Sequence, residues 1–247
     1  MKPLKNNKNI FQICINLNDD IPELQAHKQN LIKRNPKYQY HYITSNRQMF
    51  DLMEDAFANS KDELDQKIYE SFLLVERKLN TLKKREIKVL VSRTDIFRYA
   101  MTYKYGGFYL DLSSESDVDI DNDLSRYDFY AIGAGADSSG LVHSSFVYGK
   151  RGNTICRLVL EEITSACNID TRDMSLNQCK YAGPPCLARV LDSINIDEHN
   201  GKVEHQSVCS FFKMKARWKA DLHKPDKNNP NKKINRHWLF SDERLQG

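Results

Sequence analysis

The chain has 247 residues, 40% of them hydrophobic, and a formal net charge of +4. This length fits a single domain that buries about three quarters of its unfolded surface, and the composition excludes a disordered chain. The apolar runs are much shorter than the ~20 residues of a membrane-spanning helix, and the basic amino-terminal segment lacks the apolar core of a secretory signal.

The six cysteines occur singly, without a C-x-x-C pair. In a chain of this size, that usage favours buried free thiols over a disulfide framework. We therefore expect a cytoplasmic protein. Peripheral association with a membrane, or delivery into a host cell, stays open.

The amino-terminal half predicts alternating strands and helices. Apolar or alternating residues indicate strands over 9–17 and 38–44, and amphipathic spacing indicates helices over 22–34 and 46–58. The charged stretch 62–90 carries apolar residues three and four positions apart, which predicts a helical insertion or hairpin with a solvated outer face.

The stretch 92–111 begins as a helix. Ser92 and Thr94 are candidate N-caps, and Asp95 would then lie in the electropositive first turn. Asp95 and Arg98 are three residues apart and share one face of the helix, as a functional pair or as a surface ion pair.

A pair of glycines ends this helix. Gly106 can adopt the left-handed conformation of a helix end, and Gly107 lets the backbone turn into a strand over 108–112. This order delivers Asp111 to the carboxyl end of a strand, where open α/β sheets bind their ligands.

Two further strands, Phe129–Ile132 and Val142–Tyr148, enclose the glycine-rich stretch 133–140, and a helix follows through Leu158 and Ile163. A strand rather than a helix follows the G-x-G loop, which argues against a dinucleotide-binding fold. The alternation predicts a mixed, mainly parallel α/β sheet flanked by helices, in one domain spanning 1–247.

Basic residues are concentrated near the carboxyl end. The stretch 213–236 carries nine Lys/Arg against Asp221 and Asp226, together with two prolines. We interpret it as a loop, either a solvated tail or a lid whose cations meet a nucleotide diphosphate or an acidic acceptor. Few aromatic residues are interleaved with these cations, so nucleic acid is not an expected partner.

The stretch from Asp95 to Asp111 resembles the core motif of the DXD glycosyltransferases of GT-A fold. The most similar family contains the yeast initiating mannosyltransferase and bacterial capsule and lipopolysaccharide transferases; the clostridial glucosylating toxins are more distant. The matching residues are Asp95, Arg98, Tyr99, Gly106, Gly107, Tyr109, Leu110 and Asp111. Weaker similarity extends over about residues 9 to 240, including Asn35-Pro36.

The resemblance implies a GT-A-like (Rossmann-like) fold and transfer of a sugar from a UDP- or GDP-sugar, with retention, in polysaccharide biosynthesis or a related pathway. The implied acceptor is a glycan, a lipid-linked sugar or a protein. Asp95, Arg98 and Asp111 are the implied catalytic residues. Donor contacts are expected from Asp95, Arg98, Tyr109, Gln12 and Ile13.

The same resemblance implies a divalent cation, Mn²⁺ or Mg²⁺. Its expected ligands are Asp111, His237 and Ser113. Ser113 replaces the second aspartate of the motif, so we expect a weakened site, in which Glu115 or Asp117 could substitute.

A second departure concerns the first strand, where Cys14 occupies the place of a tryptophan that stacks on the nucleotide base in relatives. Both departures keep open a catalytically weakened nucleotide-sugar-binding module. A phosphatase of the haloacid dehalogenase type and an interaction protein that uses the helices of 62–90 also stay open.

Overall fold

The computed structural model describes residues 4, 7–15, 17–79, 88–133, 142–167, 183–213, 216 and 222. Its centre is a six-stranded sheet in the order β2-β1-β3-β6-β5-β7. The strands are β1 (Asn9–Ile13), β2 (Gln39–Ile43), β3 (Gly107–Leu110), β5 (Phe129–Gly133), β6 (Val142–Gly149) and β7 (Gly201–His205). β6 runs antiparallel to both of its neighbours, and the other pairs are parallel. The mixed, mainly parallel sheet expected from the sequence is confirmed.

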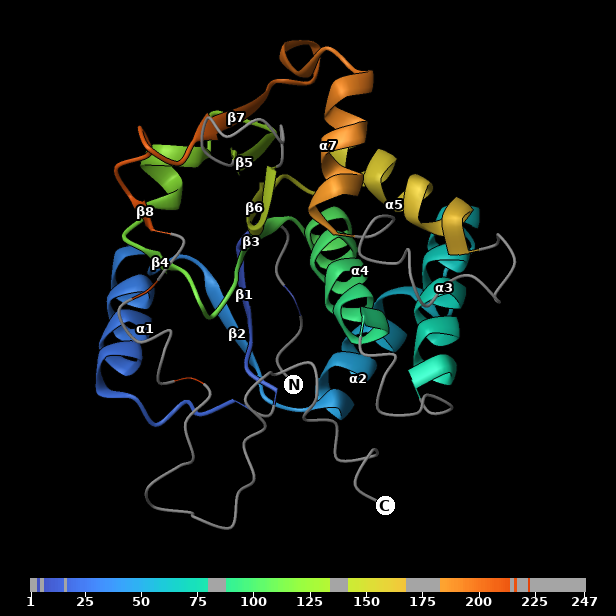
Figure 1. The fold of residues 1–247 in the computed structure, drawn as a ribbon, viewed down its shortest axis with the longest axis horizontal. Helices are drawn as coiled ribbons and strands as arrows, with labels where there is room; N and C mark the ends of the chain where they lie inside the picture. Colours follow the sequence, from blue (N-terminus) through green and yellow to red (C-terminus); the bar gives the residue numbers. More distant parts are fainter. Residues whose placement is uncertain are drawn as a thin grey trace.

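Helices cover both faces of this sheet (Figure 1). They are α1 (Pro22–Arg34), α2 (Asn46–Phe57), α3 (Glu63–Leu79), α4 (Lys88–Tyr105), α5 (Thr154–Cys167), α7 (Pro184–Ser193), and the short η1 (Ile120–Leu124) and η2 (Ile196–His199). α1 lies on one side, beside the small antiparallel pair of β4 (Glu115–Ser116) and β8 (Phe212–Lys213), and α2 to α5 lie on the other. Strand alternation sends Phe11 and Tyr109 into the core on the α4 side, and Ile10 and Phe108 into the core on the α1 side.

The predicted start of the central helix is wrong. α4 begins at Lys88, so Ser92 and Thr94 lie inside the helix and Asp95 lies beyond its first turn. Residues 89–91 are all apolar and include no helix breaker, so nothing in the chain stops the helix at Ser92. Asp95 therefore owes its position to tertiary packing and not to the dipole at a helix terminus.

α3 is an integral part of the core. Ile68, Phe72 and Val75 on this helix are fully buried and belong to the same cluster as Phe57 and Phe97. The outer face is solvated as expected, with residues such as Glu70 exposed.

This packing gives a stability prediction. Val75→Ala should lower the free energy of unfolding by about 2 kcal/mol, because it removes buried methyl groups and leaves a cavity. Glu70→Ala, on the exposed face of the same helix, is the matched control and should stay within about 0.5 kcal/mol. Urea unfolding measures both, and equal values would mean that α3 contributes little to the core.

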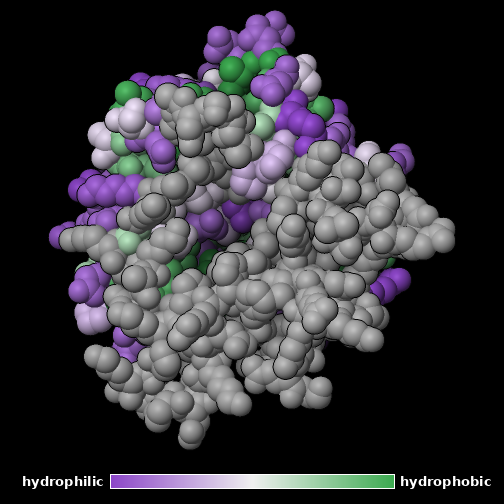
Figure 2. Space-filling view, viewed as in Figure 1, coloured by the Kyte–Doolittle hydropathy of each residue, from purple (hydrophilic) through white to green (hydrophobic). Residues whose placement is uncertain are grey.

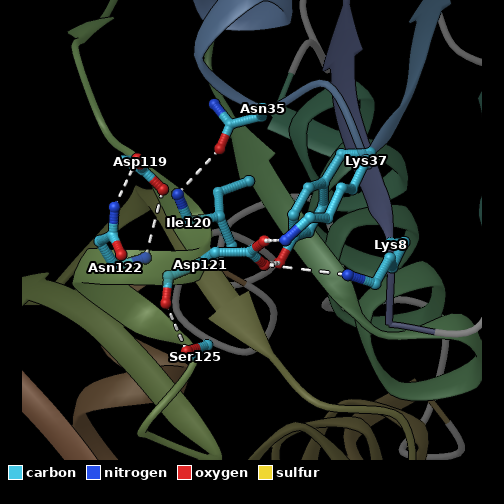
Figure 3. Close-up of polar contacts among 9 residues, drawn as sticks. Lys8, Asn35, Lys37, Asp119, Ile120, Asp121, Asn122 and Ser125 are labelled. Atoms are coloured by element: carbon cyan, nitrogen blue, oxygen red, sulfur yellow. Dashed lines mark hydrogen bonds and ion pairs between the residues drawn. The ribbon is translucent and has the colours of Figure 1, made fainter.

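The turn after α1 is held by a buried asparagine. Asn35, 3% exposed, accepts a hydrogen bond from the backbone N–H of Ile120 at 2.8 Å and donates to the backbone oxygen of Val118 at 3.0 Å. Asp121 on η1 pairs with Lys37 at 2.7 Å and lies 3.9 Å from Lys8 (Figure 3). These contacts tie the amino ends of β1 and β2 to η1, so the Asn35-Pro36 turn has a structural role here.

On the face shown in Figure 2, the visible described residues are mainly hydrophilic, with hydrophobic residues in small groups. Of the described large hydrophobic side chains, Ile32 and Val208 are exposed. No helix in the described ranges is both long and apolar enough to cross a membrane. Cys14, Cys156, Cys186 and Cys209 are buried thiols, as expected for those four.

Candidate functional site

The glycine pair positions the strand that ends at the candidate site. Gly106 has φ 68° and Gly107 has φ 124°, both conformations that disfavour a side chain. A Cβ on Gly107 would lie 2.3 Å from the backbone oxygen of Asn9. The Asn9 side-chain amide donates to the oxygen of Gly106 at 3.1 Å. The glycines therefore let α4 turn directly into β3 against β1.

Asp95, Arg98, Tyr109 and Asp111 meet at the carboxyl end of β3. Arg98 Nη2 lies 2.8 Å from Asp95 Oδ1, and Arg98 Nη1 lies 3.8 Å from Asp111 Oδ1. The Tyr109 hydroxyl donates to Asp111 Oδ1 at 2.6 Å, and the Arg98 guanidinium carbon lies 4.6 Å from the centroid of the Tyr109 ring. The sequence-predicted catalytic residues thus form one cluster.

Burial distinguishes this cluster from a surface ion pair. The side chains of Arg98 and Asp95 are 4% and 1% exposed, whereas that of Asp111 is 33% exposed. A buried pair incurs a desolvation penalty that a surface pair avoids, so stability alone is a weak reason for its presence. Asp111 is the most exposed of these three side chains.

Burial also changes the protonation of the pair. It raises the pKa of Asp95 to about 7; Arg98 opposes this rise and the Asp111 carboxylate adds to it. Burial lowers the pKa of Arg98, but Tyr109, Asp95 and Asp111 together raise it by more. The net shift is upward, so the guanidinium stays charged. Near neutral pH the cluster therefore holds one fixed cation, with an adjacent acid that can gain or lose a proton.

The two candidate donor contacts on β1 lie on opposite faces. Ile13 packs against the core on the α4 side, the side of Asp95 and Arg98. Gln12 alternates to the α1 side, where it is fully buried and its side-chain oxygen accepts from the Tyr40 hydroxyl. The structure therefore brings Ile13, but not Gln12, to the face of the cluster.

The candidate metal ligands that the structure describes are Asp111, Ser113, Glu115 and Asp117. Ser113 lies in the turn in which the Ser114 N–H donates to the Asp111 backbone oxygen at 3.0 Å. Glu115 is buried on β4, and Asp117 is exposed and accepts from Asn30 on α1 at 2.9 Å. In the described ranges no three His, Cys, Asp or Glu residues form a group that could hold a metal ion. His237 lies outside the described residues.

Two described residues of the carboxyl-terminal stretch cover the end of β1. Ala216 and Leu222 pack with Cys14, which is 4% exposed. Backbone hydrogen bonds of 3.0 Å join Ala216 to Ser113 and Leu222 to Asn18. The rest of the predicted lid at 213–236, apart from Lys213 on β8, lies outside the described residues. Cys14, which stands where relatives have the base-stacking tryptophan, is therefore covered.

Comparison with known families supports a class of protein. Residues 22–130 match the model of a family described as a glycosyltransferase sugar-binding region containing a DXD motif. This region contains Asp95, Arg98, Tyr109 and Asp111. The match supports a glycosyltransferase of the DXD type and covers somewhat less than half of the chain.

Among solved structures, the chain is similar to the one titled PaToxG Glycosyltransferase, with a TM-score of 0.51 and 16% sequence identity. The likeness covers 78% of this chain and 71% of that chain. At this identity the likeness concerns the fold, and it agrees with the expected GT-A-like sheet flanked by helices. Curated protein sequences gave no significant match.

Proposed function

We propose that this protein moves a sugar from a UDP- or GDP-sugar to a glycan or other acceptor, with retention at the anomeric carbon. The observation that carries the proposal is the cluster of Asp95, Arg98 and Asp111 at the carboxyl end of β3. Glycosyl transfer has to stabilise a leaving diphosphate and an oxocarbenium-like sugar. A fixed cation between two carboxylates supplies charges of both signs at one place.

Arg98 is suited to the leaving diphosphate. The guanidinium is held by Asp95 at 2.8 Å and stacked on Tyr109, so its orientation is set before the donor arrives. Preorganised charge of this kind requires little rearrangement during the reaction. We assign the diphosphate contact to Arg98, and sugar-hydroxyl contacts to Asp95 and Asp111.

A divalent cation fits this site only in part. Hard cations prefer several oxygen ligands, and of the two carboxylates in the cluster Asp95 is paired with Arg98 at 2.8 Å, which leaves Asp111. We propose that Mn²⁺ or Mg²⁺ binds weakly to the free protein, since the phosphates of the donor would have to supply most of its ligands. The proposed roles of Arg98, Asp95 and Asp111 do not depend on it.

The segment carrying Ala216 and Leu222 is proposed to be the base of a lid. These residues lie over Cys14 and beside the turn that follows Asp111, so a nucleotide entering there would displace them. The cations of 213–236 would then face the diphosphate.

A panel of UDP- and GDP-sugars tests the proposal, with donor hydrolysis as the first readout because water can react when no acceptor is present. We expect at least one donor to be hydrolysed and the initially released sugar to keep its anomeric configuration, as followed by NMR. If no donor is hydrolysed but UDP or GDP still binds, the chain is a nucleotide-sugar-binding module. That outcome is the alternative favoured by Ser113 in place of the second aspartate.

A further inference from the structure

Ser145 on β6 lies directly opposite Asp111. β3 and β6 pair antiparallel with Leu110 opposite Phe146, and the Asp111 N–H extends the ladder by donating to the Ser145 oxygen at 2.8 Å. Directly opposed residues of an antiparallel pair project their side chains from the same face. Ser145 therefore shares the face of Asp111 and Tyr109, the face on which α4 carries Asp95 and Arg98.

The hydroxyl of Ser145 has no hydrogen-bond partner within the described part of the chain, although its oxygen is buried. Buried hydroxyls are normally paired, and leaving one unpaired costs free energy. The neighbouring Asp111 uses only Oδ1 in its described contacts, with Tyr109 and Arg98. A buried hydroxyl and a carboxylate oxygen thus lie side by side on neighbouring strands without a described partner.

We propose that Ser145 is a specificity-determining residue whose hydroxyl binds a hydroxyl group of the transferred sugar, next to Asp111. This inference rests on the proposed function. A sugar hydroxyl can donate to the Asp111 carboxylate and accept from Ser145, so the two side chains match both of its hydrogen-bonding roles.

The other parts of a nucleotide-sugar fit this position less well. A phosphate carries negative charge, which the Arg98 guanidinium can neutralise. The neutral hydroxyl of Ser145, beside the Asp111 carboxylate, cannot neutralise it. A divalent cation responds mainly to the number of carboxylates, and Ser145 adds none. The neutral sugar is therefore the part of the nucleotide-sugar that the Ser145 hydroxyl fits best.

The test compares wild type, Ser145→Ala, Ser145→Thr and the control Ser71→Ala, which changes a buried serine on α3. With the donor that wild type hydrolyses, Ser145→Ala should raise KM about tenfold. Its Kd for the free UDP or GDP should not change. Ser145→Thr, which keeps the hydroxyl, should recover most of the loss, and Ser71→Ala should match wild type.

Donor analogues lacking one sugar hydroxyl each complete a double-mutant cycle. With wild type, one analogue should have a KM about tenfold higher than that of the complete donor. With Ser145→Ala, the same analogue and the complete donor should have equal KM values. The proposal would be overturned if the effect of Ser145→Ala on KM simply added to the effect of the missing hydroxyl for every analogue. It would also be overturned if Ser145→Ala raised the Kd of free UDP or GDP by the same factor.

Thermal unfolding of the ligand-free variants separates this inference from the proposed function. Ser145→Ala should keep or raise the melting temperature, because it removes an unpaired buried hydroxyl. A clear fall would mean that the hydroxyl is paired within the protein, which overturns the inference even if donors bind. If wild type binds no nucleotide-sugar, the proposed function fails and the sugar assignment fails with it.

Discussion

Asp111→Asn should lower kcat/KM for donor hydrolysis by about a thousandfold, the upper range for losing one preorganised electrostatic group. The carboxylate is the solvent-accessible member of the cluster, it accepts from Tyr109 at 2.6 Å, and it lies 3.8 Å from Arg98. An amide keeps the shape of the side chain but removes the negative charge. Initial rates with the best donor measure the effect.

The matched control is Asp128→Asn. Asp128 precedes β5 at the amino end of the sheet, opposite the end that carries Asp111, and it pairs with Lys150 at 2.7 Å in an exposed setting. This variant should keep the wild-type rate, because a surface pair contributes little to stability and nothing to the site. Full activity of Asp111→Asn would remove Asp111 from the catalytic assignment.

The local part of the site could be predicted from the sequence because short-range geometry determines it. Asp95 and Arg98 share a helix face at i,i+3, and the two glycines link that helix to β3 and Asp111. The cluster is therefore specified within the short span Asp95–Asp111. Five strands of the sheet could be predicted in the same way, from their own apolar or alternating patterns. β7 could not, because Gly201–His205 contains one apolar side chain, that of Val203.

Contacts between distant segments could not be predicted. The spacing of Asp95 and Arg98 fits a surface pair equally well, and only the surrounding fold makes it a buried one. The cover of Ala216 and Leu222 over Cys14 joins segments about 200 residues apart, and no periodicity signals it. Ser145 could not be identified from the sequence, because its position depends on the register of β6 against β3.

The start of α4 shows a different limit. Ser92 and Thr94 are good capping residues, and local preference places the helix end there. The helix begins at Lys88 instead, and residues 89–91 contain no glycine or proline that would end it before Ser92.

Asp95→Asn should remove the contribution that Asp95 makes to the pH dependence of stability between about pH 4 and 7. Burial raises the pKa of Asp95 to about 7, against about 3.9 for an aspartate in an unfolded chain. In this window the folded state holds a proton that the unfolded state has lost. The contribution of Asp95 to stability must therefore fall as the pH rises from 4 to 7, by at most about 4 kcal/mol, and Asp95 adds no further slope above that window.

Asparagine cannot titrate, so the free energy of unfolding of Asp95→Asn relative to wild type should increase steadily from pH 4 to 7. Urea unfolding at several pH values measures this difference. The control Val75→Ala, a core change without charge, should lower the free energy of unfolding by the same amount at every pH. The variant should also lose about a hundredfold in kcat/KM, because Arg98 loses the charged partner that orients it. A difference that is flat with pH would show that Asp95 has an ordinary pKa, and one that decreases would show that attraction to Arg98 outweighs burial.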